Sequence, residues 1–306
     1  MLKGSMTALI TPFKNGKVDE KAFQDFCVWQ IDQGTDALVA CGTTGESPTL
    51  SHPEHNRVVE LCIEAAKGRV PVIAGAGSNS TRESVDMIQS IQKMVGDTAV
   101  LCVTGYYNNP PQEGLTAHFE TLSAETGAKI VIYNVPARTA SYLEADTLIR
   151  LAADKNIIGL KQAIDFRSEG KFREDTKKVI AATKSLDFSV VSGEDDGVAE
   201  ILALGGNGVI TASGNIPEVA RLFLKIVAAG KAGNAAEAKQ LQEDAMVFVK
   251  AVFARKNPLP LAALFDSPLF QPLVSVRDTA GGEEVQAMLM DLVRDHAPSL
   301  KKYHNF

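Results

Sequence analysis

The sequence has no apolar run long enough to cross a membrane, and it carries no surplus of positive charge. A membrane-spanning helix needs about 18 or more consecutive apolar residues, and no such stretch occurs. The apolar run at the N-terminus is also too short for a signal peptide. The net charge of -6 gives no general attraction to nucleic acid or to anionic membranes. We therefore expect a cytoplasmic protein that binds neither nucleic acid nor a membrane.

Cysteine is scarce, and its positions do not fit a metal centre. The four cysteines are Cys27, Cys41, Cys62 and Cys102, and they lack the paired spacing of a structural zinc site. All four lie in apolar segments, where free cysteines are usually buried and reduced. We expect four buried thiols, no disulfide and no bound metal.

Short apolar runs alternate with helical patterns along most of the chain. The eight predicted strands cover residues 4–11, 36–41, 71–75, 99–104, 129–135, 157–161, 188–192 and 208–212. The predicted helices cover residues 19–33, 53–67, 81–94, 112–125, 143–153, 172–183, 197–204 and 217–229, and Ser51 with Glu54 forms a capping box at the start of the second. This strict alternation implies parallel strands joined by crossover helices.

Eight such units predict an α/β fold of the (β/α)8 TIM-barrel type over residues 1–230. An open doubly wound sheet is the alternative, but no Gly-x-Gly-x-x-Gly opens a helix after the first strand. Residues 231–306 continue with apolar positions at helical spacing, including Leu241, Met246, Val249 and Phe253. We expect them to form a small helical subdomain packed on the barrel, with Asn257-Pro258-Leu259-Pro260 interrupting it.

Lys161 ends the sixth predicted strand, where a buried strand would normally stay apolar. An ammonium group taken out of water without a partner is costly, so a lysine there is usually paired, deprotonated or used covalently. The simpler interpretation is a lysine whose ammonium reaches solvent from the end of the strand. The residues at neighbouring strand ends decide between these two interpretations.

In a (β/α)8 barrel, catalytic residues lie at the carboxyl ends of the strands and in the loops that follow them. The second strand is followed by Gly42-Thr43-Thr44-Gly45-Glu46-Ser47, a turn whose hydroxyl and N–H groups suit a carboxylate or a phosphate. Tyr106 and Tyr107 follow the fourth strand. A tyrosine hydroxyl near a lysine amine can transfer protons, although either tyrosine alone would be interpreted as an ordinary aromatic contact.

The fifth strand ends in Tyr133-Asn134-Val135-Pro136-Ala137-Arg138-Thr139. The Arg138 guanidinium can bind a carboxylate in bidentate fashion, or it can form a surface ion pair. Thr43, Tyr107, Tyr133, Arg138 and Lys161 all fall at the expected catalytic end of successive strands. This convergence favours a catalytic site over independent structural roles.

Five motifs together carry a resemblance to a known family. They are Gly42-Thr43-Thr44-Gly45-Glu46, Tyr106-Tyr107-Asn108, Tyr133-Asn134-Val135-Pro136-x-Arg138-Thr139, Gly159-Leu160-Lys161 and Ser192-Gly193-Glu194-Asp195. In this order, over nearly the whole chain, they resemble the dihydrodipicolinate synthases. That family belongs to the pyruvate-dependent class I aldolases, which also include N-acetylneuraminate lyase. The arginine after the Tyr-x-x-Pro element is typical of the synthases.

The resemblance implies a lyase of lysine (diaminopimelate) biosynthesis that condenses pyruvate with L-aspartate 4-semialdehyde. Lys161 would form a Schiff base with pyruvate, and Tyr133, Thr43 and Tyr107 would relay protons, with Tyr107 reaching the site from a neighbouring subunit. Thr44 and Gly193 would contact substrate, and Arg138 would hold the carboxylate of the semialdehyde. The covalent imine on Lys161 needs no metal or other cofactor. A homo-oligomer, dimer or tetramer, is also implied.

A second group of residues resembles the feedback site at which some family members bind L-lysine. It consists of Ser47, His52, His55, Asn79, Glu83 and Tyr106. The resemblance implies allosteric inhibition by lysine. The alternative for His52 and His55 is two solvated residues at a helix start, where a cation is unfavourable against the helix dipole.

The chain departs from the family pattern at several positions. Gln162 stands where the family usually has glutamate, Gly105 where many members have proline, and Pro48 where alanine is usual. Asp165 and Phe166 replace small residues after the sixth strand and would reshape the acceptor side of the pocket. Two alternatives therefore stay open, namely a related class I aldolase acting on another 2-oxo acid and a catalytically silent ligand-binding barrel.

Overall fold

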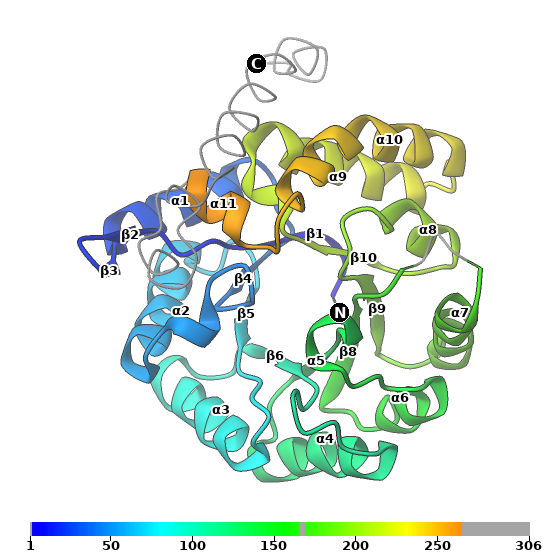
Figure 1. The fold of residues 1–306 in the computed structure, drawn as a ribbon, viewed down its shortest axis with the longest axis horizontal. Helices are drawn as coiled ribbons and strands as arrows, with labels where there is room; N and C mark the ends of the chain where they lie inside the picture. Colours follow the sequence, from blue (N-terminus) through cyan, green and yellow to red (C-terminus); the bar gives the residue numbers. More distant parts are fainter. Residues whose placement is uncertain (1, 166–168, 265–306) are drawn as a thin grey trace.

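The computed structural model describes residues 2–165 and 169–264. Eight parallel strands close into a barrel in the order β1-β10-β9-β8-β7-β6-β5-β4 (Figure 1). They are β1 (Gly4–Ala8), β4 (Ala37–Ala40), β5 (Val72–Gly75), β6 (Ala99–Val103), β7 (Ile130–Asn134), β8 (Ile157–Gln162), β9 (Ser189–Ser192) and β10 (Gly208–Thr211). The predicted TIM barrel and all eight predicted strands are confirmed, and the open-sheet alternative is wrong.

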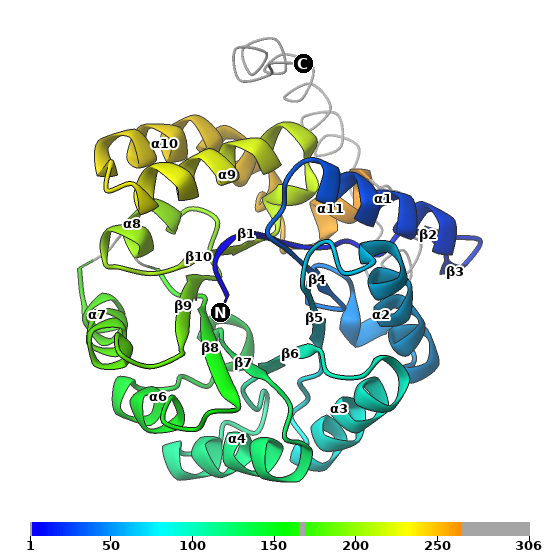
Figure 2. The same ribbon diagram turned by 180° about the vertical axis from the view of Figure 1, so that it is seen from behind.

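The barrel helices form an outer ring around these strands (Figures 1 and 2). They are α1 (Glu20–Asp32), α2 (His52–Ala66), α3 (Thr81–Val95), α4 (Gln112–Thr126), α6 (Ala145–Leu151), α7 (Lys171–Thr183), α8 (Val198–Ala203) and α9 (Pro217–Lys231). The capping box predicted at the start of α2 is present, because Ser51 and Glu54 bond each other's backbone N–H groups. Each predicted helix is found within two residues at each end, and α6 is shorter than predicted by two residues at both ends.

Two apolar layers result from the alternation of side chains along the strands. Inside the barrel, Met6, Val39, Ile73, Val131 and Ile210 belong to one buried cluster. The alternate side chains point outward and pack with the helices in a second, larger cluster. Inward residues near the carboxyl ends of the strands therefore reach the mouth of the barrel.

The seam that closes the barrel requires close backbone approach between β1 and β10. A Cβ atom at Gly208 would lie 2.0 Å from the Gly4 carbonyl oxygen, and one at Gly4 would lie 1.9 Å from Asp36 Oδ2. That Asp36 carboxylate instead accepts a 2.8 Å hydrogen bond from the Ser5 N–H. Glycine at both positions lets β1 pair with β10 on one side and β4 on the other.

The chain continues past the barrel into α10 (Ala235–Val252) and the short helix α11 (Leu259–Leu264). Gln242 joins α10 to the barrel, because its Nε2 donates to the Asp195 carbonyl at 2.7 Å while its Oε1 accepts from the N–H groups of Val198 and Ala199. The expected helical character of this segment is thus present through Leu264. The domain boundary at 230 stays a prediction, and residues 265–306 lie outside the described part of the chain.

Some elements were not predicted from the sequence. A hairpin joins β2 (Phe13–Lys14) to β3 (Lys17–Val18), and the helix α5 (Pro136–Thr139) follows β7 directly. The hairpin turn is Asn15-Gly16, with both residues at positive φ, which is a strong turn signal that the apolar pattern does not report. The four cysteines are free and buried, as predicted. Within the described residues, no helix has the length and apolar character needed to span a bilayer.

Candidate active site

The pairing of β7 with β8 places Tyr133 directly beside Lys161 at the mouth of the barrel. Both side chains point into the barrel, and their relative exposures are 8% and 7%. Lys161 Nζ lies 4.2 Å from the centroid of the Tyr133 ring. No carboxylate of the described residues lies within ion-pair distance of this nitrogen. Lys161 is thus almost fully buried beside an aromatic ring, which disfavours the interpretation of a lysine that extends into bulk solvent.

Gly193 gives the Lys161 side chain its room. A Cβ atom at Gly193 would lie 3.1 Å from both Cγ and Cε of Lys161 and 2.8 Å from the Ala163 Cβ. Any larger residue at the end of β9 would push the lysine stem out of its position. Gly193, expected to contact substrate, is thus placed against the lysine itself.

A cavity of about 400 Å³ opens above Lys161, and we call it the Lys161 cavity. Thr43, Thr44, Tyr133, Arg138 and Gly193 line it, so it gathers every predicted catalytic and substrate-binding residue except Tyr107. These side chains come from loops or strand ends after four different barrel strands. The arrangement can hold a small carboxylic acid beside an enclosed amine.

Asn257 ties the far wall of the Lys161 cavity to the barrel. Its carbonyl accepts a 2.9 Å hydrogen bond from Arg138 Nη2, and its side-chain Nδ2 donates to Thr44 Oγ1 at 3.0 Å. The Asn257 side chain is buried, and its Oδ1 has no hydrogen-bond partner among the described residues. Sequence reasoning treated Asn257 only as part of a helix interruption, and the run Asn-Pro-Leu-Pro is the signal that pointed to it.

Glu194 is the carboxyl group that lines this cavity. Burial raises its pKa to about 7, and the neighbouring charges of Asp195 and Asp196 act in the same direction. Lys161 and Arg138 partly oppose this rise. Near neutral pH the side chain is therefore poised between its neutral and ionised forms, a state that the sequence did not reveal.

Asp195, next along the chain, has a structural role. Its carboxylate accepts hydrogen bonds from the N–H groups of Ser213 at 2.7 Å and Ala212 at 3.3 Å, which fixes the end of β9 to the loop after β10. Burial raises the pKa of this carboxyl, while the bonds from Ser213 and Thr211 oppose the rise.

The outward faces of β7 and β8 carry a polar network behind the catalytic pair. Gln162 is fully buried; its Oε1 accepts from Asn134 Nδ2 at 2.9 Å, and its Nε2 donates to Thr176 Oγ1 at 3.1 Å. Asn134 also exchanges hydrogen bonds with the Leu143 backbone. Both the oxygen and the nitrogen of the Gln162 side-chain amide are thus hydrogen-bonded, and the network contains no buried charge. The departure from glutamate at this position leaves the strand pair well supported.

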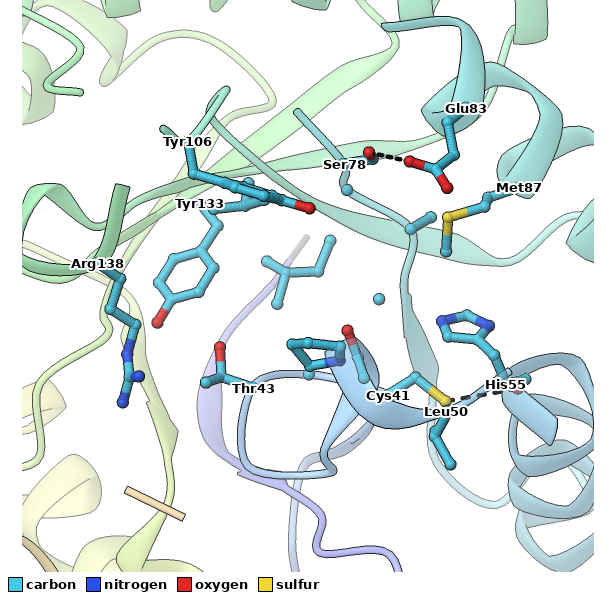
Figure 3. A pocket seen from close by; sticks show the side chains of 18 of the residues that line it. Cys41, Thr43, Leu50, His55, Ser78, Glu83, Met87, Tyr106, Tyr133 and Arg138 are labelled. Carbon is cyan, nitrogen blue, oxygen red and sulfur yellow. Dashed lines mark hydrogen bonds between the residues drawn. The ribbon is translucent and has the colours of Figure 1, made fainter. Parts of the chain in front are cut away.

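A second cavity, of about 410 Å³, lies beside the first, and we call it the His55 cavity. Five of the six residues of the expected lysine-binding group line it, namely Ser47, His52, His55, Glu83 and Tyr106. Asn79 does not line the cavity, but its Nδ2 donates to the Tyr106 carbonyl at 3.3 Å. Thr43, Tyr133 and Arg138 line both cavities, so the two meet at the proposed proton relay (Figure 3).

The wall of the His55 cavity opposite Tyr133 carries Glu83 and His55 (Figure 3), and His52 also lines this cavity. Glu83 hydrogen-bonds Ser78 Oγ and lies 3.4 Å from His52 Nε2. His55 is buried, its Nε2 has no hydrogen-bond partner in the described structure, and burial lowers its pKa to about 4. A neutral imidazole and a carboxylate therefore face the same space, which suits a ligand that carries an ammonium group. The interpretation of both histidines as solvated residues is wrong for His55.

Tyr107 is the one expected catalytic residue that the single chain does not bring to the site. It is 94% exposed and has a positive φ of 77°. The base of its loop is fixed, because Ser141 Oγ donates to the Gly105 carbonyl at 2.8 Å. The loop is therefore supported even with glycine at position 105, where many family members have proline.

Asp165 is exposed, and Phe166 lies outside the described residues, so the expected reshaping of the acceptor side stays a prediction.

The fold and the site define a class, namely (β/α)8-barrel lyases of the class I aldolase type, with a buried lysine at the carboxyl end of the sixth barrel strand. Comparison with known families makes the assignment narrower. Residues 1–268 match the model of the Dihydrodipicolinate synthetase family. The chain belongs to this family.

Individual relatives agree with the family match. The chain is 44% identical over 282 residues to the 4-hydroxy-tetrahydrodipicolinate synthase of Bradyrhizobium diazoefficiens, covering 90% of this chain and 92% of the relative. The chloride-inhibited dihydrodipicolinate synthase from Acinetobacter baumannii, solved in complex with pyruvate, aligns with a TM-score of 0.85 at 34% identity and covers 97% of this chain and 99% of its own. The enzyme from Cyanidioschyzon merolae, solved with lysine bound, gives a TM-score of 0.83 at 33% identity and covers 94% and 97%.

Proposed function

We propose that the chain condenses pyruvate with L-aspartate 4-semialdehyde to form 4-hydroxy-tetrahydrodipicolinate, in lysine biosynthesis. The single observation that carries this proposal is the enclosed Lys161 amine beside Tyr133, in a cavity that also holds Thr44 and Arg138. The 44% identity to the 4-hydroxy-tetrahydrodipicolinate synthase of Bradyrhizobium diazoefficiens supports it. Four buried free thiols suit a reducing compartment, so we place the reaction in the cytoplasm, which an activity assay on fractionated cells would check.

In the proposed first half-reaction, Lys161 Nζ attacks the ketone carbon of pyruvate, and loss of water leaves an imine. Thr43 and Thr44 hold the pyruvate carboxylate through hydroxyl and N–H groups. The protonated imine draws electrons from the adjacent methyl group, so loss of one methyl proton gives an enamine. The imine itself is the electron sink, and no dissociable cofactor is needed for this step.

In the proposed second half-reaction, the enamine carbon forms a bond to the aldehyde carbon of the semialdehyde, whose oxygen takes up a proton. The amino group of the semialdehyde then attacks the imine carbon, and the Lys161 amine leaves to give the cyclic product. Arg138 lines the cavity and has donors available for the acceptor carboxylate, because among the described residues its guanidinium bonds Asn257 alone, through Nη2. Tyr133, buried beside Lys161, relays the protons.

The first prediction separates the two half-reactions. Arg138→Ala lowers kcat/KM for aspartate semialdehyde about 10- to 100-fold, because a charge-assisted contact to one substrate is lost. Imine formation with pyruvate, measured by borohydride trapping, changes by less than about twofold because that substrate does not use Arg138. Coupled product assays and single-turnover trapping measure the two steps separately.

Arg150→Ala is the matched control, since Arg150 is an exposed arginine that pairs with Glu120 on the outer helices. Equal losses in both half-reactions of Arg138→Ala would contradict the assigned role. A wild-type chain that is active on a panel of sugar-acid substrates but forms no product from aspartate semialdehyde would contradict the proposed function and favour the related-aldolase alternative.

We also propose that the protein acts as a homo-oligomer, dimer or tetramer, in which Tyr107 enters the site of a neighbouring copy. The proposal is supported by the Tyr107 side chain, which is 94% exposed although Ser141 fixes the base of its loop. An aromatic ring held so far out of its own chain is typical of a residue that is buried by a partner.

The second prediction tests this exchange. Tyr107→Phe and Lys161→Ala are each expected to be almost inactive alone, because one lacks the proton relay and the other the nucleophile. When the two variants are dissociated, mixed and reassembled, about half of the dimers are mixed, and each mixed dimer has one of its two sites with both Tyr107 and Lys161 intact. Activity therefore returns to roughly a quarter of wild type on statistical mixing. Recovery is measured by the coupled assay. No recovery in mixed oligomers verified by mass would contradict a role for Tyr107 across subunits.

We propose further that L-lysine binds in the His55 cavity and inhibits the enzyme. Glu83 and the unpartnered His55 Nε2 supply a carboxylate and an acceptor for an ammonium group. The cavity shares Thr43 and Tyr133 with the Lys161 cavity, which gives an occupant direct contact with the proton relay. The lysine-bound Cyanidioschyzon merolae relative supports the choice of ligand.

The third prediction concerns this inhibition. Glu83→Gln raises the lysine concentration needed for half inhibition about 10- to 100-fold, because a charge-assisted hydrogen bond becomes neutral. Each inhibition curve is scaled to the variant's own uninhibited rate. Glu113→Gln, an exposed carboxylate on α4 that lines neither cavity, is the control. Initial rates that stay constant up to millimolar lysine would contradict the effector site.

A further inference from the structure

One wall of the Lys161 cavity is formed by the segment that follows α10. Residues 253–257 line this wall, and Asn257 anchors the segment through its bonds to Arg138 and Thr44. Lys256 and Arg255 directly precede Asn257 in the chain, so the hydrogen bonds of Asn257 also fix the backbone positions of these two basic residues. They line the cavity while remaining exposed to solvent.

Neither cation of this pair meets a carboxylate in the part of the chain that the structure describes. Arg255 Nη1 donates to the carbonyl of Ala254 at 3.2 Å, and within the described ranges no carboxylate lies within 4.0 Å of Arg255 or Lys256. Several basic side chains on the outer helices do pair with a carboxylate, as Arg57, Arg82 and Arg150 do. The two cations at the cavity rim are therefore available to a ligand.

The charge of the Lys161 cavity is opposite to that of the whole chain. Its lining includes Arg138, Lys161, Arg255 and Lys256 but a single acidic residue, Glu194. The chain as a whole has a net charge of -6. A positively charged cavity mouth in an acidic protein raises the local concentration of anions at that mouth.

The positions of the cations along the cavity also differ. Lys161 is buried at its floor, Arg138 lies on the shared wall, and Arg255 with Lys256 stands at the solvent edge. Arg138 is itself exposed, so an anion entering from solvent meets Arg138, Arg255 and Lys256 before it reaches the buried Lys161. Long flexible side chains at such an edge act over the screening length of the solution, about 8 Å at physiological salt.

We propose that Arg255 and Lys256 form an anion-binding rim beside Arg138 that recruits the acceptor aldehyde through its carboxylate. This inference rests on the proposed function, since it assigns a recruitment site to the second substrate. The chemical class that the rim selects is a short aldehyde that carries a carboxylate. An aldehyde without a carboxylate is not attracted by the positive charge of the rim.

The test measures kcat/KM for aspartate semialdehyde at saturating pyruvate, over a series of salt concentrations. The double variant Arg255→Gln with Lys256→Gln lowers kcat/KM about 5- to 20-fold at low ionic strength, and the loss shrinks at high salt because the steering field is screened. The kcat value stays within about twofold, because neither side chain contacts the reacting atoms. The charge-keeping variant Arg255→Lys with Lys256→Arg retains the wild-type salt dependence.

Lys184→Gln with Lys239→Gln is the matched control, because it removes two exposed charges that line neither cavity. A rim variant whose kcat/KM and salt dependence equal those of this control overturns the proposal. So does an equal loss in the rate of pyruvate imine trapping, since the rim would then not act on the acceptor. If wild type makes no product from aspartate semialdehyde, the proposed function fails, and the rim assignment fails with it.

Discussion

The parallel pairing of β7 with β8 is the constraint on which the site depends. Its register sets Tyr133 opposite Lys161 on the inward face and Asn134 opposite Gln162 on the outward face. Because side chains alternate along a strand, a shift of β8 by one residue would place Leu160 or Gln162 opposite Tyr133 and turn Lys161 to the outward face. The hydrogen bonds among Asn134, Gln162 and Thr176 oppose such a shift from the helix side. The position of the amine is thus fixed by backbone pairing and by a neutral buried network.

The loops at the barrel mouth add chemistry to this fixed pair. Asn257 joins Arg138 and Thr44, which lie far from it in the sequence, so both substrate-binding walls share one anchor. Thr43 and Tyr133 line both cavities, and an occupant of the His55 cavity therefore contacts residues that the catalytic cavity also uses. Catalysis and inhibition in this account are coupled by shared walls rather than by a change in the fold.

The apolar pattern was sufficient to predict the eight strands and the barrel, because a closed parallel sheet buries both faces and leaves a repeated signal in the sequence. The positions of Thr43, Tyr133, Arg138 and Lys161 in one cavity followed from the same rule about strand ends. The hairpin at Asn15-Gly16 was missed because its strands are two residues long and carry no apolar repeat.

Other features could not be predicted because they depend on distant parts of the chain. The bond from Arg138 to Asn257 spans 119 positions, and no local pattern specifies it. The raised pKa of Glu194 arises from burial and from neighbours that only the folded barrel supplies. The room that Gly193 leaves for Lys161 is likewise a matter of packing between β8 and β9.

The central claim is that the Lys161 amine forms the covalent bond to pyruvate, and one mass measurement tests it most directly. The protein is incubated with pyruvate and borohydride, digested, and its peptides are sequenced by mass spectrometry. The account predicts one reduced pyruvate adduct per chain, on Lys161, and none in Lys161→Ala. An unmodified Lys161, or an adduct that persists in Lys161→Ala at wild-type yield, would contradict the account.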